Sequence, residues 1–308
     1  MFLTVLQMGV VIACGALWRR FAPGTIATDE VRKALSDLVY YLLLPALVLD
    51  VLWQAPLGAD SARIAVVAAA CVTAGLGLSW LACRLCNASG PRTGAMMLAA
   101  GFPNATYLGL PVLEKALGPW ARSVAIQFDL FACTPLLLSL GMAIAARYGV
   151  RGTSHNALAT LLRVPALWAV LLAVTLQIAG VERPVFADAV LDLLGAAVIP
   201  LMLLVLGMSL RLQALQPSQL RLVVPVLLIQ LLLMPLLAVA LAGIIGLGGR
   251  VAMATVLEAA MPSMVLGIVI SDRFGLDTGL YAAAVTLTTV CCLATLPLWH
   301  YVLQAGIG

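Results

Sequence analysis

Long hydrophobic runs alternate with short polar segments along the whole chain. A helix needs about 20 mostly apolar residues to cross about 30 Å of hydrocarbon. Ten segments meet this requirement, at residues 2–18, 34–54, 63–83, 93–116, 120–146, 158–179, 185–209, 219–246, 250–271 and 278–303. The pattern therefore predicts an all-α polytopic membrane protein with ten transmembrane helices, joined by loops too short to form a soluble domain.

The composition agrees with this pattern. Hydrophobic residues make up 63% of the chain and charged residues only 10%, against about 45–50% and about 25% in soluble domains. Metalloprotease, phosphate-loop and serine-hydrolase motifs are missing from the sequence, and its two histidines form no metal-binding cluster with the cysteines. We therefore expect no enzyme, no cofactor, no metal site apart from a coupling ion, and no nucleic-acid partner; the solvent is the lipid bilayer.

Positive charges divide unevenly between the two sets of loops and helix ends. One side carries twelve: Arg19, Arg20, Arg32, Lys33, Arg84, Arg92, Arg147, Arg151, Arg163, Arg211, Arg221 and Arg273. The other carries five: Arg63, Lys115, Arg122, Arg183 and Arg250. Because cytoplasmic loops are enriched in lysine and arginine, we expect both termini on the outer side. In a bacterium this is the periplasmic face of the inner membrane.

Prolines recur in corresponding spans of the two halves. Three pairs are separated by 155, 159 and 162 residues: Pro45 with Pro200, Pro103 with Pro262, and Pro135 with Pro297. Around the middle pair, "LAAGFP" (98–103) matches "LEAAMP" (257–262) at three of six positions. Since each half holds five spans, the second half enters the membrane from the opposite side. We expect two inverted five-helix repeats, 1–150 and 151–308, in one integrated membrane domain.

The fourth span (93–116) and the ninth span (250–271) are predicted to be broken near mid-membrane. Pro103-Asn104 and Pro262-Ser263 interrupt them at similar depth, and such a break survives only inside protein or beside a water-filled cavity. The N-terminus of each half-helix carries unpaired N–H groups and about half a positive charge. With the side chains of Asn104, Thr106 and Ser263, these ends predict a binding site for an anion such as a carboxylate.

Two carboxylates lie within the predicted spans. Asp129 follows Arg122 by seven residues and Glu258 follows Arg250 by eight, so both are expected at comparable depth. Intramembrane carboxylates are costly and usually functional. We expect Asp129 and Glu258 to couple transport to an ion, H⁺ or Na⁺, and Gln127 to line the same cavity.

Three stretches resemble the auxin efflux carrier family of membrane transport proteins: "FPNATYLGLPVLEKALG" (102–118), "AAVIPLMLLVLGMSL" (196–210) and "AAMPSMVLGIVISDRFG" (259–275). The resemblance covers nearly the whole chain. It implies two inverted five-helix repeats whose fourth and ninth helices cross at their prolines. It also implies transport of organic anions, which are auxin in plants and dicarboxylates such as malonate or malate in bacteria. On this basis Pro103, Asn104 and Pro262 map to the crossover, with the substrate carboxylate near Asn104.

A wider likeness connects the chain to bile acid/sodium symporters, which share this architecture. In that family a glutamate before the ninth-span crossover binds sodium, and Glu258 occupies a similar position. This sequence has Pro262-Ser263 where that family usually has Gln-Asn. Sodium at Glu258 is therefore an alternative to a coupling proton.

The resulting prediction is a secondary active transporter of a small mono- or dicarboxylate that works by alternating access. Spans three, four, five, eight, nine and ten form what we term the crossover unit, and spans one, two, six and seven the scaffold unit. The alternatives are a sodium-coupled symporter of the bile-acid type and a channel-like pore. The sequence leaves open the substrate, the direction of transport, the coupling ion and the formation of a homodimer.

Overall fold

The chain folds into a bundle of helices. The structure, a computed structural model, describes residues 2–22, 24–55, 57–151, 159, 162–211 and 217–307, and within these ranges it contains no β-strand. The α-helices are α1 (Phe2–Phe21), α2 (Thr28–Leu38), α3 (Leu44–Gln54), α4 (Ala59–Leu85), α5 (Gly90–Gly101), α6 (Leu110–Leu117), α7 (Ala121–Phe128), α8 (Thr134–Leu136), α9 (Met142–Tyr148), α11 (Pro165–Ile178), α12 (Val185–Ala196), α13 (Val198–Ser209), α14 (Pro217–Leu228), α15 (Met234–Ile244), α16 (Gly249–Ala259), α17 (Gly267–Phe274) and α18 (Thr278–Ile307). The all-α prediction is confirmed.

Seven helical runs are long and apolar enough to cross a membrane: Phe2–Phe21, Thr28–Gln54, Ala59–Leu85, Ala121–Tyr148, Val185–Ser209, Gln219–Ile244 and Thr278–Ala305. The three remaining expected spans differ. Residues 93–116 and 250–271 are each divided into two helices. Span 158–179 appears as the 14-residue helix α11, and its residues 158, 160 and 161 lie outside the described ranges. The chain is thus a multi-pass membrane protein, while the ten-span inverted repeat stays a prediction.

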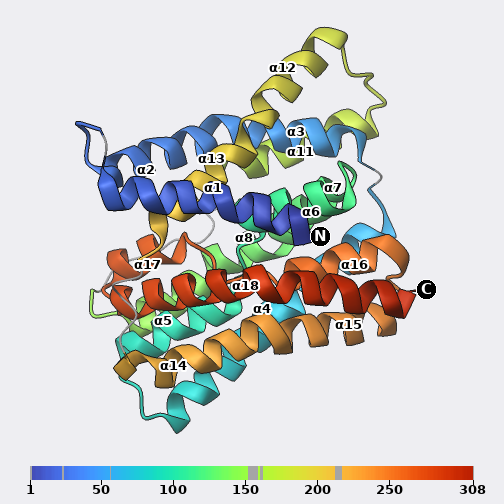
Figure 1. Ribbon diagram of the computed structural model, residues 1–308. Coiled ribbons are helices and arrows are strands. Elements are labelled where there is room, and N and C mark those ends of the chain that lie inside the picture. Colours follow the sequence, from blue (N-terminus) through green and yellow to red (C-terminus); the bar gives the residue numbers. More distant parts are fainter. Residues whose placement is uncertain are drawn as a thin grey trace.

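The helices form two groups. Figure 1 shows α1, α2, α3, α11, α12 and α13 on one side of the molecule, and α4, α5 and α14 to α18 on the other, with α6, α7 and α8 between them. Within the first group α1 packs closely on α13. The helices approach so closely that a Cβ added to Gly15 would lie 2.3 Å from the Leu204 carbonyl oxygen. Both termini lie towards the same end of the bundle (Figure 1).

Wide π-helical turns precede several prolines. These turns are η1 (Val39–Leu43), η2 (Ala105–Gly109), η3 (Asp129–Cys133), η4 (Leu137–Gly141) and η6 (Ile229–Leu233). All except η4 end two residues before a proline: Pro45, Pro111, Pro135 and Pro235. Proline has no N–H and its ring crowds the carbonyl of the preceding turn, so a wider turn relieves the clash without ending the helix.

Prolines that the sequence pairs between the two halves differ in their local effect. Pro135 follows the π-helical turn η3, whereas its counterpart Pro297 lies inside the continuous helix α18. The π-helical turns contain Asp129 and Gln230, two of the buried polar residues of the membrane segments. A proline in this chain therefore interrupts, widens or leaves unbroken the helix around it, according to its surroundings.

Candidate functional site

The two broken helices meet each other. In the fourth span α5 ends at Gly101 and η2 starts at Ala105, and in the ninth span α16 ends at Ala259 and α17 starts at Gly267. An isolated antiparallel β-bridge joins Pro103 to Ser263 between these ends. The structure thus brings together two breaks that are about 160 residues apart in sequence, as the sequence predicts.

Backbone hydrogen bonds make this junction. The Asn104 N–H donates to the Pro262 carbonyl at 2.7 Å, and the Met264 N–H donates to the Phe102 carbonyl at 3.0 Å. Each extended segment thereby satisfies polar groups that the other leaves without a helical partner. Since an unpaired backbone group inside a membrane costs several kcal/mol, the breaks stabilise one another.

Side chains from neighbouring helices hold the second break. Gln230 Nε2, from η6, donates to the Met261 carbonyl at 3.0 Å. Three side chains of α18 also bond to the backbone of this break. Cys292 Sγ donates to the Ala260 carbonyl (3.7 Å) and Tyr281 Oη donates to the Met264 carbonyl (2.9 Å), while Thr288 Oγ1 accepts from the Ser263 N–H (3.2 Å). The sequence analysis did not single out Gln230. The available signal was one glutamine inside a strongly hydrophobic span.

A cavity of about 90 Å³ lies beside the junction, and we term it the crossover cavity. Asn104, Thr106 and Asp129, which were all predicted as site residues, line it. The remaining lining residues include Tyr40, Leu44, Tyr107, Thr134, Val164, Ala166, Met264, Val265 and Leu266. Residues at the N-terminal ends of η2 and α17 therefore border the same space. The Asn104 amide nitrogen is buried and has no hydrogen-bond partner.

Asp129 is buried in the wall of this cavity. One of its carboxylate oxygens accepts a hydrogen bond from the Thr106 hydroxyl, and the other accepts from Thr134 Oγ1 at 2.9 Å. Thr106 belongs to the broken fourth span and Thr134 to the helix that carries Asp129. The carboxylate therefore ties the two elements together while facing the cavity.

Glu258 occupies a separate, fully buried position. Its side chain has 0% exposure, and neither carboxylate oxygen has a hydrogen-bond partner in the structure. It lies against Gly109, where an added Cβ would be 2.2 Å from Oε2. Glu258 does not line the crossover cavity.

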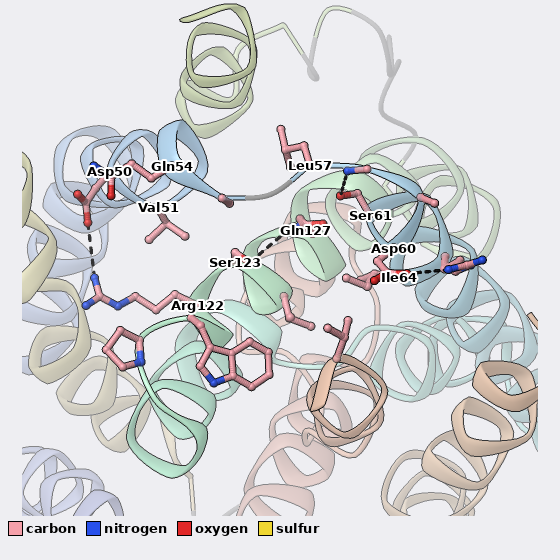
Figure 2. Close-up of a pocket in the computed structure, with 18 of the residues that line it drawn as sticks. Asp50, Val51, Gln54, Leu57, Asp60, Ser61, Ile64, Arg122, Ser123 and Gln127 are labelled. Carbon is pink, nitrogen blue, oxygen red and sulfur yellow. Dashed lines mark hydrogen bonds and ion pairs between the residues drawn. The ribbon is translucent and has the colours of Figure 1, made fainter. Parts of the chain in front are cut away.

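The other predicted site residues fall in two places. Pro103, Pro262 and Ser263 are buried at the junction, and the Ser263 hydroxyl oxygen has no hydrogen-bond partner in the structure. Gln127 instead lines a second and larger cavity of about 900 Å³. We term it the outer cavity because Arg63, Arg122 and Arg183, which border it, belong to the side that the charge distribution predicts to face outward. Figure 2 shows Gln127 beside Ser123 in this outer cavity.

An ion-pair network borders the outer cavity. Asp50, at the end of the second span, pairs with Arg183 at 2.6 Å and with Arg122 at 3.5 Å. Arg122, at the start of the fifth span, also lies 3.2 Å from Glu114. The Asp50–Arg122 pair therefore joins α3 to α7 (Figure 2).

Known proteins resemble this chain over nearly its full length. It is 28% identical over 305 residues to an uncharacterized transporter of Methanothermobacter thermautotrophicus, covering 97% of both chains. It is 24% identical to the uncharacterized transporter MJ1031 of Methanocaldococcus jannaschii, covering 90% of this chain and 92% of the other. It is 25% identical to the uncharacterized transporter YfdV of Escherichia coli K12, covering 90% of both.

The family model described as "Membrane transport protein" matches residues 1–300. This match includes both helix breaks and all residues of the crossover cavity. This is the family that the segments 102–118, 196–210 and 259–275 resemble. The chain belongs to the membrane transport protein family of auxin efflux carriers.

Proposed function

We propose that the protein is a secondary active transporter of a small organic anion, a mono- or dicarboxylate, and that it works by alternating access. The observation that carries this proposal is the junction of Pro103 with Ser263 beside the crossover cavity. Two helices broken at the same point, with a cavity between their half-helix ends, are typical of the substrate sites of such carriers.

The anion is proposed to bind with its carboxylate in the crossover cavity. Helix N-termini favour negative charge because they present unpaired N–H groups and the positive end of the helix dipole. Residues preceding α17 and residues of η2 line this cavity. The unpartnered amide nitrogen of Asn104 supplies one further donor. Thr106, whose hydroxyl is bonded to Asp129, can exchange that partner for the substrate.

Asp129 explains why an anion carrier needs a coupling ion. Two negative charges 4 Å apart repel by about 4 kcal/mol at an effective dielectric constant of about 20. A substrate carboxylate in the crossover cavity therefore binds well only if Asp129 carries a proton or a paired cation. Glu258, buried nearby without a hydrogen-bond partner, is the second candidate for H⁺ or Na⁺.

The arrangement of the cavities favours a carrier over a channel. The crossover cavity is lined by the scaffold unit, through Tyr40, Leu44 and Ala166, as well as by the crossover unit. A void of about 10 Å³ adjoins it, sharing Leu44, Thr106 and Leu130 with its wall and bordered also by Leu110 and Ile126. A site enclosed between two units is what relative motion of those units can open to one side at a time.

We further propose that the two halves are inverted repeats, because the paired breaks lie in the fourth and ninth spans. The charge distribution supports an inner-membrane protein with both termini in the periplasm. Lipid surrounds the helices, as their exposed apolar side chains require.

Uptake into proteoliposomes that contain the full chain tests the function. We expect saturable uptake of labelled malonate, malate or indole-3-acetate that depends on a proton or sodium gradient. Thr106→Val should reduce the affinity, while its matched control Thr175→Val, an exposed threonine bonded to its own helix, should not. Flux that rises linearly with concentration would identify a pore, and no uptake of any carboxylate would contradict the proposal.

A further inference from the structure

We propose that the outer cavity is a second binding site for the transported class of anion, with Arg122 as the anchor for a carboxylate. We propose in addition that Gln127 accepts a hydrogen bond from an O–H or N–H group of the same ligand. This inference rests on the proposed transport of organic anions. It assigns to the carrier a site that substrate occupies before or after the crossover cavity.

The outer cavity has the size and the walls of a ligand site. Its volume of about 900 Å³ is ten times that of the crossover cavity and lies within the range of about 300–1,000 Å³ typical of small-molecule pockets. Apolar side chains form much of its wall, among them Val51, Leu57, Ile64 and Val124. A small organic acid with an apolar body fits these surroundings.

Arg122 is the guanidinium that a ligand can engage at least cost. Its Asp50 contact is long, at 3.5 Å. Its Nε atom is buried and makes no hydrogen bond, even though Glu114 lies 3.2 Å away. Asp50 keeps Arg183 as a partner at 2.6 Å when Arg122 turns away. A ligand carboxylate therefore gains a charge-assisted bond in competition with Glu114, and without leaving Asp50 unpaired.

Gln127 also lines this cavity and has an unused, buried acceptor. Its side chain is only 3% exposed, and its Nε2 donates to Ser123 Oγ at 3.4 Å. Its Oε1 has no partner in the structure, and a buried acceptor without a donor is costly. Arg122, Ser123 and Gln127 all belong to α7 and point into the outer cavity (Figure 2).

The remaining charges of the outer cavity make this site weak. Arg63 is paired with Asp60 at 2.8 Å, Arg183 is bonded to Asp188, and Asp192 adds a further acid to the lining. Acidic groups therefore outnumber basic ones around the cavity. A substrate held mainly by Arg122 leaves again easily, which suits a site on the way to or from the crossover cavity.

Calorimetric titration of the detergent-solubilised full chain tests the inference. The probes are 4-hydroxyphenylacetate and phenylacetate, which differ by one hydroxyl donor. We expect two sites in the wild type and one in Asn104→Ala. In that background, Arg122→Gln should weaken the remaining site at least about tenfold, the loss expected for a hydrogen bond to a charged group. Arg63→Gln, the control from the same cavity, should change the affinity by less than about twofold, because Arg63 is already paired with Asp60.

Two further variants guard against a folding artefact. Glu114→Gln removes a competitor of the ligand at Arg122 and should tighten the outer site, an effect that misfolding cannot produce. Gln127→Leu should abolish the preference of that site for 4-hydroxyphenylacetate over phenylacetate. The inference is overturned if Asn104→Ala removes all binding, or if Arg122→Gln leaves the remaining site unchanged. If Asn104→Ala changes nothing and Arg122→Gln removes all binding, the proposed crossover site fails while the outer site stands.

Discussion

The two helix breaks are held in different ways. The ninth-span break receives partners from four side chains, Gln230, Tyr281, Thr288 and Cys292. Among the described residues, no side chain bonds to the backbone of 102–104 in the fourth span, which relies on backbone partners alone. In return, Asn104, which lines the crossover cavity, keeps its buried amide nitrogen unpartnered. The ninth-span break is thus held rigid by neighbouring side chains, whereas the fourth-span break offers the side chain of Asn104 to a ligand.

The largest loss of stability is expected at a contact of the two broken spans outside the junction, where Gly109 lies against Glu258. In Gly109→Ala the added Cβ meets the Glu258 carboxylate at 2.2 Å, and overpacking a buried site typically costs about 1–3 kcal/mol. The melting temperature of the purified protein should fall. Gly77→Ala, with nothing within 4 Å of the added Cβ, is the matched control and should not lower it. Equal melting temperatures for both variants would contradict the contact.

The second prediction concerns the fourth-span break. Asn104→Ala should weaken carboxylate binding by about tenfold or more, since hydrogen bonds to charged groups contribute about 1.5–3 kcal/mol. Thermal stability should change little, because the Asn104 amide nitrogen has no partner to lose. Binding isotherms and melting curves of the same preparations check both halves of this statement. A large loss of stability would show that Asn104 serves the fold.

The third prediction concerns the ninth-span break and has the opposite signature. Gln230→Leu removes the donor to the Met261 carbonyl and should lower stability by about 0.6 kcal/mol, the average for hydrogen bonds between membrane helices, and by no more than about 1.7 kcal/mol. Substrate affinity should hold within about twofold, because Gln230 does not reach the crossover cavity. A variant that binds more weakly yet melts at the wild-type temperature would erase the distinction between the breaks.

The smallest effect is expected from a change of one pH unit. If Asp129 must be protonated for an anion to bind beside it, the affinity of the wild type falls by at most about tenfold for each unit by which the pH rises. Asp129→Asn mimics the neutral form and should bind with an affinity independent of pH. Titrations between pH 5 and 8, with and without Na⁺, check this. A wild-type affinity that changes with Na⁺ alone would assign the coupling to a cation instead.

Much of this arrangement could be predicted from residue types and their depth. Pro103, Asn104 and Pro262 marked the breaks, and Asp129, expected inside its span at a depth comparable to that of Glu258, lines the crossover cavity with Asn104. The direction in which a polar side chain points was harder to predict. A π-helical turn adds one residue, which rotates the following helix face by about 100°, and hydrophobicity does not reveal such turns. Gln127 precedes the turn η3 and lies two residues before Asp129, about 200° around the helix axis, so it lines the outer cavity rather than the crossover cavity.

Two contacts were missed for a related reason. Gln230 donates to the Met261 carbonyl and the Glu258 carboxylate packs against Gly109, and both partners are distant in sequence. Neither partner carries a side-chain signal, since one is a main-chain oxygen and the other a glycine. Tertiary packing decides such contacts, and a single sequence records only one side of them.

The junction between Pro103 and Ser263 also bears on how this family can change its substrates. Both of its hydrogen bonds run between main-chain atoms, which every amino acid except a donor-lacking proline provides. Side chains around the crossover cavity can therefore be exchanged over evolutionary time without dissolving the crossing of the two spans. One architecture can then serve carriers of chemically different acids, because side chains recognise the substrate whereas main-chain atoms hold the crossing together.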